Sequence, residues 1–154
     1  MVDVNPPRLA GHERETLLAL LQYHRDSVVK KVEGLDDGQS RWSPVASGTS
    51  LLRLVQHLAH AETLWFVQRF TGDRDAALPP SGTIDEAVEA YRATWARVDA
   101  IVATEDLEAS CRGLDPDEPP ANLRWVLTHL LEETARHAGH ADIIRELIDG
   151  QTGR

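Results

Sequence analysis

Apolar residues along the chain recur every three or four positions, which is the spacing that lines one face of an α-helix. Four segments show this pattern, at about 12–33, 51–70, 84–102 and 122–149. No run of five or more residues alternates convincingly between apolar and polar positions, as a half-buried strand would. With linkers of about 10 to 16 residues, the pattern predicts an all-α four-helix bundle with long crossover connections.

Local signals mark the ends of the predicted helices. Ser50 is a good N-cap for the second segment, and Thr83 opens a capping-box sequence at the start of the third. Gly34 and Gly150 follow the first and last segments, where glycine commonly ends a helix. The first connector is rich in turn-forming residues, and we expect Trp42 to anchor it.

Length and charge exclude several classes of protein. A chain of 154 residues is the size of one ordinary domain, so we expect residues 1–154 to form a single domain. The net charge of −9 and the absence of a basic run argue against nucleic acid as a partner. No window approaches the roughly 18 apolar residues of a membrane span, and the N-terminal stretch lacks a signal-peptide core. We therefore expect a cytoplasmic protein with no membrane partner.

The single cysteine, Cys111, lies in the polar linker before the last predicted helix. One cysteine can form no intramolecular disulfide and no CxxC metal site. It also has no neighbouring base in the sequence that would activate it as a nucleophile. We interpret Cys111 as an ordinary loop thiol.

The last predicted helix carries ionisable residues within its apolar stripe. On a wheel of about 100° per residue, Glu133, His137 and His140 share a sector with apolar residues on either side of them along the helix. His129 lies one turn before Glu133. Carboxylates and imidazoles are costly to bury, so this stripe needs a hydrogen-bonding partner, a solvent-filled cavity or a metal ion.

A metal between two helices would satisfy both the imidazoles and the carboxylate. Glu133 and His137, four residues apart, supply ligands on one side, so a third ligand must come from another helix. In the second segment the periodicity favours His57 as the inward residue and places His60 on the surface. Two nitrogens and one oxygen leave positions open for water and substrate, which is typical of catalytic metal sites.

Other interpretations stay open at this point. A glutamate four residues before a histidine also arises by chance as a surface salt bridge, and a buried polar network is a third possibility. His129 fits either a residue that hydrogen-bonds Glu133 or a plain border residue. Trp65 and Trp125 fit core packing or the wall of a pocket. A di-iron centre of the ferritin type is disfavoured, because the sequence has no ExxH motif.

Two stretches, SLLRLVQHLAHAETLWF and EETARHAGHADIIREL, resemble a known family. They are similar to the second and closing helices of the DinB-like metal-binding four-helix proteins, and the resemblance extends over about residues 10–149. It places the metal ligands on His57, Glu133 and His137. Many relatives have histidine where this chain has Glu133, but the thiol-dependent maleylpyruvate isomerases have glutamate there. His140 stands where many relatives have glutamine.

The resemblance implies a divalent metal, usually zinc or nickel. In several relatives a low-molecular-weight thiol such as mycothiol, bacillithiol or glutathione is transferred to a small-molecule electrophile, and a metal can activate such a thiol by lowering its pKa. It therefore implies a metal-dependent thiol S-transferase or isomerase, with His140 or His129 assisting proton movement. Fourteen arginines against two lysines are compatible with a GC-rich genome and make mycothiol a plausible thiol.

The same resemblance leaves one alternative and adds one expectation about assembly. The alternative is a non-catalytic protein that binds metal or a small ligand, for example in a stress response. Relatives are often dimers, so the resemblance also implies a homodimer.

Overall fold

A computed structural model describes residues 4–153 of the chain; residues 1–3 and 154 of the predicted domain lie outside the described residues. The helices are α1 (Glu13–Lys30), α2 (Asp37–Arg41), α3 (Leu51–Glu62), the π-helix η1 (Thr63–Thr71), α4 (Ile84–Thr104) and α5 (Leu123–Asp149). Between residues 4 and 153 there is no β-strand, only an isolated antiparallel bridge between Ser110 and Asn122. The all-α prediction is confirmed.

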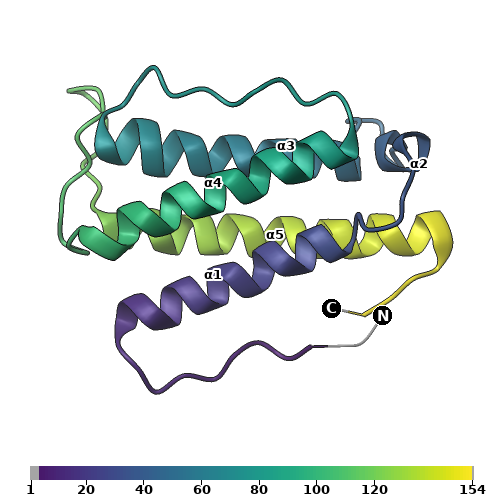
Figure 1. Cartoon of the computed structure of the whole chain (residues 1–154), viewed down its shortest axis with the longest axis horizontal. Coiled ribbons are helices and arrows are strands. Elements are labelled where there is room, and N and C mark those ends of the chain that lie inside the picture. Colours follow the sequence, from purple (N-terminus) through teal and green to yellow (C-terminus); the bar gives the residue numbers. More distant parts are fainter. Residues whose placement is uncertain (1–3, 154) are drawn as a thin grey trace.

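The long helices form a bundle with one extended crossover. Helices α1 and α5 run in one direction, and α3 with η1 and α4 run in the other (Figure 1). Helix α1 packs along α5, and α3 packs along α4. Residues 72–83 pass back along the bundle, so that α3 and α4 can run parallel (Figure 1). This connection is the kind of crossover that the sequence predicts.

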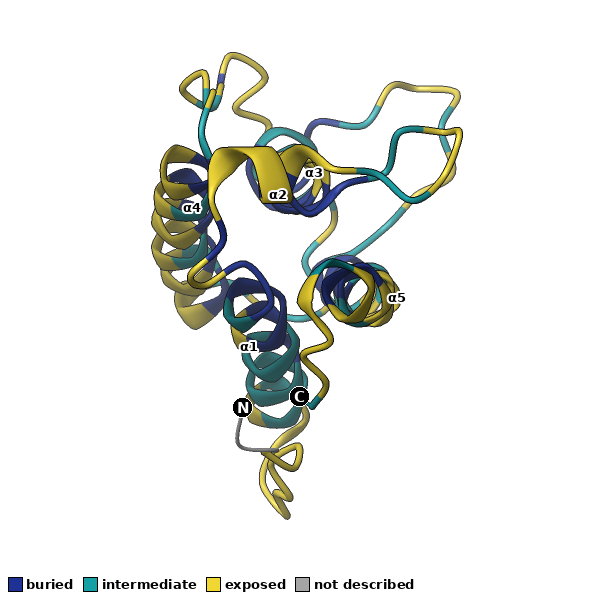
Figure 2. Ribbon diagram, turned by 90° about the vertical axis from the view of Figure 1, so that its right-hand side faces the viewer, coloured by how far each residue is buried: buried dark blue, intermediate teal, exposed yellow. Residues whose placement is uncertain are grey.

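The view along the bundle shows the buried segments of the long helices turned toward its middle (Figure 2). Helix α3 contributes Val55 and Leu58 to this core, and α5 contributes Val126 and Leu130; all four are fully buried. No helix in residues 4–153 is long and apolar enough to cross a membrane. The amphipathic pattern of the sequence thus corresponds to faces packed against one another.

Most predicted helix ends are confirmed by their capping contacts, but α1 ends at Lys30 and not beside Gly34 as predicted, because residues 31–34 form a turn. The side chains of Ser50, Thr83 and Asn122 each accept a hydrogen bond from a backbone N–H in the first turn of α3, α4 and α5. Glu86 completes the capping box of α4 through its contact with the backbone of Thr83. Gly150 ends α5 with a φ of 76°, a left-handed conformation that glycine adopts without strain.

The first connector differs from its prediction in two ways. It contains the short helix α2, which begins with a capping box formed by Asp36 and Gln39. Trp42 directly follows this helix and is 45% exposed, so the expectation that it anchors the connector is wrong. A helix of five residues lacks the repeated apolar spacing by which longer helices are recognised.

The second predicted helix is continuous but changes type after Glu62. From Thr63 onward it is a π-helix, which is wider than an α-helix. Near its end, the carbonyls of Arg69 and Phe70 accept hydrogen bonds from the backbone N–H groups of Gly113 and Arg112, at 2.8 and 3.1 Å respectively. The linker between α4 and α5 therefore closes the end of η1.

A buried ion pair joins α1 to the end of α3. Arg25 Nε donates to Glu62 Oε1 at 2.9 Å, and both side chains are fully buried. Burial raises the pKa of the Glu62 carboxyl, and the guanidinium of Arg25 opposes that rise. The second nitrogen of the guanidinium contacts Glu62 Oε2 at 2.5 Å, and this two-point contact favours the ionised pair. This pair was not predicted from the sequence.

Candidate metal centre

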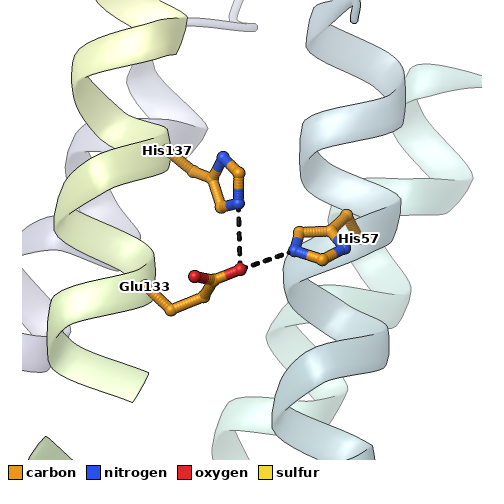
Figure 3. A group of neighbouring side chains, drawn as sticks. All are labelled: His57, Glu133 and His137. Carbon is orange, nitrogen blue, oxygen red and sulfur yellow. Dashed lines mark hydrogen bonds and ion pairs between the residues drawn. The ribbon is translucent and has the colours of Figure 1, made fainter. Parts of the chain in front are cut away.

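The predicted ligands meet between α3 and α5. His57 extends from α3, and Glu133 and His137 extend from successive turns of α5 (Figure 3). His57 Nε2 lies 2.8 Å from Glu133 Oε1, and His137 Nε2 lies 3.0 Å from the same oxygen. The two imidazole rings are 4.8 Å apart and nearly perpendicular. The three side chains thus converge on one point.

This arrangement fits a divalent metal ion. One ligand atom from each residue lies within 4.8 Å of the other two. Ligand bonds of about 2.1 Å in a tetrahedral site hold ligand atoms about 3.4 Å apart, so small side-chain rotations bring the three atoms to that spacing. Two imidazole nitrogens and one carboxylate oxygen suit several first-row metals, zinc and nickel among them.

The site lies at the edge of the bundle. The side chain of His57 is 47% exposed, whereas those of Glu133 and His137 are 22% and 16% exposed. The prediction that His57 points inward is therefore only partly correct, because its ring reaches toward α5 and stays open to solvent. His60 is exposed, as predicted. One side of the centre is consequently accessible to water and small molecules.

The environment keeps the proposed ligands in states that bind metal. For Glu133, burial raises the pKa, but hydrogen bonds from His57 and His137 outweigh it, so the pKa lies below its ordinary value. For His137, burial lowers the pKa and the neighbouring imidazoles of His57 and His140 lower it further, so that despite the opposing Glu133 carboxylate the pKa lies below its ordinary value. At neutral pH the carboxyl is ionised and the His137 imidazole is neutral, which are the forms that coordinate a metal.

His140 lies behind one of the proposed ligands. Its Nδ1 is 3.2 Å from Nδ1 of His137, on the side of that ring away from the Nε2 that faces Glu133. A hydrogen bond between the two Nδ1 atoms fixes the orientation of the His137 ring. The structure thus brings His140 next to the ligands, one step removed from the point where they converge.

His129 belongs to a different cluster. Its ring stacks on Trp125 with centroids 4.8 Å apart, and it meets the edge of Trp65 at 5.2 Å. Within residues 4–153, no hydrogen bond joins His129 to Glu133, so the structure does not place it as the partner that the sequence analysis considered. The aromatic contacts account for the position of His129 by packing.

A polar hollow of about 260 Å³ adjoins the proposed ligands, and we call it the metal pocket. It is lined by Ser47, Thr49, Arg53, Leu54, His57, His137 and His140. The contributions of Arg53 and of the loop before α3 were not predicted from the sequence. A signal for Arg53 was available, since it precedes His57 by one helical turn, whereas the path of a loop leaves no periodic trace.

Two other features lie away from this centre. A larger hollow of about 700 Å³ separates the end of α1 from the start of α4, and its lining residues include Glu33, Asp85 and Glu89 but no histidine or cysteine. Cys111 is partly buried, and burial raises the pKa of its thiol. A thiol with a raised pKa is a poor nucleophile, which agrees with its interpretation as an ordinary loop residue.

Comparison with known proteins adds a family to this geometry. The model of the mycothiol-S-transferase family matches residues 16–150, a span that includes all three proposed ligands. A search of curated proteins found no match. Among solved structures, the chain is similar in fold to a conserved protein from Enterococcus faecalis, with a TM-score of 0.65, 17% identity, and coverage of 92% of this chain and 100% of that one. The chain belongs to the mycothiol-S-transferase family of DinB-like proteins.

Proposed function

We propose that this protein is a divalent-metal-dependent S-transferase that joins mycothiol to a small electrophile, with His57, Glu133 and His137 as metal ligands. One observation carries the proposal: the three ligand atoms lie within 4.8 Å of one another beside an open polar pocket. The family of the chain supports the choice of a thiol as the cosubstrate and of mycothiol among the thiols.

Different residues of the chain have different roles in such a metal site. A divalent metal there would lower the pKa of a bound thiol and hold it as a thiolate at neutral pH. Glu133 directs both imidazole Nε2 atoms toward one point, and His140 holds the ring of His137 through its far nitrogen. Arg53 lines the metal pocket and supplies positive charge for an anionic sulfur or carboxylate.

The transfer step is a substitution at an electrophilic carbon. The sulfur forms a new bond to that carbon with its own electron pair, and the leaving group departs with the electron pair of the broken bond. The thiol proton is released in the same overall reaction, so a thiol and an electrophile R–X give a thioether and HX. The chain contributes by binding both reactants in the metal pocket and holding the sulfur close to the carbon.

Metal content is the first test. We expect the purified wild type, after loading with zinc or nickel, to retain about one ion per chain, as three convergent ligands predict. His60→Ala, which changes an exposed histidine on the same helix, should retain the same amount. His137→Ala should retain almost none, as measured by mass spectrometry of the metal after dialysis. Equal retention by His137→Ala would contradict the ligand assignment.

Turnover is the second test, and it separates the enzyme from a non-catalytic metal-binding protein. The metal-loaded protein is mixed with monochlorobimane and, in turn, mycothiol, bacillithiol and glutathione. We expect adduct formation above the uncatalysed rate with mycothiol, and loss of that excess in His137→Ala. A protein that binds one metal ion but accelerates none of the three reactions would support the non-catalytic alternative.

We further propose that the protein forms a homodimer, as the family resemblance implies. Sedimentation velocity of the metal-loaded protein should give about twice the 17.1 kDa mass of the chain. A species that stays at 17.1 kDa at high micromolar concentration would refute this.

A further inference from the structure

Two large apolar side chains are exposed beside the metal pocket and line one hollow. Val45, in the loop before α3, is 50% exposed, and Ile143, on α5, is 61% exposed. With Pro44 and Ile144 they form most of the wall of a hollow of about 260 Å³, which we call the apolar pocket. A single exposed apolar residue is ordinary, but a hollow lined by several is typical of a site for an apolar group.

The apolar pocket adjoins the metal pocket. Thr49 and His140 line both hollows. His140 in turn lies 3.2 Å from the proposed ligand His137, measured between their Nδ1 atoms. The two pockets are therefore neighbours, and a small molecule seated in the apolar pocket lies against His140 and Thr49, next to the proposed metal ligands.

The two pockets differ in chemistry, and S-transfer needs two substrates. Ser47, Thr49 and Arg53 give the metal pocket hydroxyl groups and a positive charge, which suit a polar thiol. Aliphatic side chains dominate the apolar pocket. Transfer of a hydrocarbon group into such a pocket is favourable, whereas a sugar thiol would lose hydrogen bonds to water there.

We infer that the apolar pocket binds the apolar portion of the electrophile, so that the protein selects electrophiles bearing a compact alkyl or aryl group. This inference rests on the proposed function. A cavity of about 150 Å³ accommodates benzene, so a hollow of this size accommodates a substituted ring or an alkyl chain of about six to eight carbons. Each buried methylene should strengthen binding about fourfold, which corresponds to about 0.8 kcal/mol.

A 1,2-epoxyalkane is a suitable electrophile for the test, because its chain length can be varied without changing its reactive end. The thiolate sulfur forms a bond to the terminal carbon, and the carbon–oxygen bond breaks with its electron pair remaining on oxygen. That oxygen takes up one proton, which replaces the proton lost by the thiol. The reaction balances without any oxidant, reductant or further reactant.

Binding without turnover gives the first readout. Unreactive 1-alkanols of four to eight carbons are titrated into the metal-loaded full chain by calorimetry. We expect affinity to rise about fourfold per methylene until the pocket is filled. Ile143→Ala should weaken binding of the longer alkanols about tenfold, because three carbons of the wall are removed. Metal content and circular dichroism should be unchanged, since Ile143 is exposed.

Leu147→Ala is the matched control. Leu147 is also an exposed apolar residue of α5, one turn after Ile143, but it lines a separate hollow together with Trp42. This variant should bind alkanols as the wild type does. Equal loss in the two variants would show unspecific binding to an apolar surface, and an affinity independent of chain length would show that the apolar pocket binds no hydrocarbon group. Either result overturns the inference.

Turnover with the epoxide series separates this inference from the proposed function. If kcat/KM with mycothiol rises with epoxide chain length in the wild type and not in Ile143→Ala, the result supports both the apolar-pocket inference and the proposed S-transfer. Thiol transfer that is indifferent to chain length overturns the pocket assignment alone. If alkanol binding depends on Ile143 but no thiol is transferred, the proposed reaction is overturned, whereas the assignment of the apolar pocket as a site for hydrocarbon groups stands. If Ile143→Asp converts a dimer into a monomer and the dimer binds no alkanol, a second copy covers the pocket and the inference fails.

Discussion

A single carboxylate oxygen, Oε1 of Glu133, lies within hydrogen-bond distance of both imidazoles of the proposed ligand set. Because both imidazoles contact this one acceptor, their Nε2 atoms, which come from different helices, point toward the same place before a metal ion binds. The second nitrogen of His137 is held in turn by His140. At the scale of residues, the centre is therefore a short chain of contacts in which each side chain limits the freedom of the next.

Removing the imidazole of His140, the last residue in this series of contacts, should allow the proposed ligand His137 to move more freely. We expect His140→Ala to weaken metal affinity about 10- to 100-fold while leaving the fold intact, because a hydrogen bond to the back of a ligand imidazole fixes its orientation. Competition with a chromophoric chelator measures the affinity. His60→Ala serves as the control, since it removes an exposed imidazole from α3. Unchanged affinity in His140→Ala would show that its contact with His137 is incidental.

Acidification should weaken the centre. The pKa values of Glu133 and His137 both lie below their ordinary values, so the unfolded chain binds more protons in the acid range than the folded chain does. The stability that these groups contribute is therefore present above about pH 6.5, the ordinary pKa of histidine, and is lost as the pH falls through the lower folded values.

Metal binding follows the same direction, because protons compete for the same atoms. The rise in melting temperature that added zinc produces should be constant between about pH 8 and pH 7 and should shrink below about pH 6.5. Scanning fluorimetry across a pH series measures it. A zinc-induced rise that grows with acidity would contradict the assignment of imidazole ligands.

At the scale of elements, short-range signals predicted the starts of α3, α4 and α5 well, whereas α1 ends earlier than its predicted end at Gly34. Ser50, Thr83 and Asn122 cap the helices that they precede, because a side-chain oxygen there satisfies a backbone N–H that the helix leaves free. The change to a π-helix after Glu62 was not predicted. The end of this π-helix is bonded to the distant linker at Arg112 and Gly113, a contact that the local sequence does not contain.

That linker approaches η1 so closely that only glycine fits at position 113. A Cβ there would lie 2.1 Å from the carbonyl oxygen of Gln68, a contact that backbone must move to relieve. We expect Gly113→Ala to lower the free energy of unfolding by about 1–3 kcal/mol, as overpacking does elsewhere. Urea denaturation followed by circular dichroism gives the value.

Gly139 provides the contrasting substitution. It lies within α5, and a Cβ added there meets no atom within 4 Å. Gly139→Ala should raise the free energy of unfolding by about 1 kcal/mol, because alanine favours the helical conformation more than glycine does. A Gly113→Ala variant at least as stable as the wild type would show that the close approach at Gly113 has no energetic effect, and a less stable Gly139→Ala variant would contradict the gain expected at Gly139.

At the scale of the whole molecule, the sequence predicted the helices and the candidate ligands better than it predicted what surrounds them. His57, Glu133 and His137 could be paired because helical spacing orders residues on one face, and the family resemblance named the same three. The buried pair of Arg25 and Glu62 could not, since partners 37 residues apart become neighbours only through packing. The part played by the loop before α3 in the apolar pocket could not be predicted either, because it also depends on packing between distant segments.

One consequence follows from where the proposed ligands lie along the chain. His57 and Glu133 are 76 positions apart, and they belong to helices α3 and α5, which must dock before all three ligands can meet. A metal ion bound there would close a long loop, and it would stabilise contacts that form late in folding. A metal ion that links the helices in this way slows unfolding more than it speeds folding.

We therefore expect zinc to lower the rate of unfolding in urea and to leave the refolding rate close to that measured with chelator. Stopped-flow fluorescence of the tryptophans, with and without zinc, measures both rates. A refolding rate that rises by the factor by which unfolding slows would show that the ligands meet early instead. With the expected result, the rate of metal loss would determine the lifetime of the folded protein. The metal centre would then give the bundle kinetic stability.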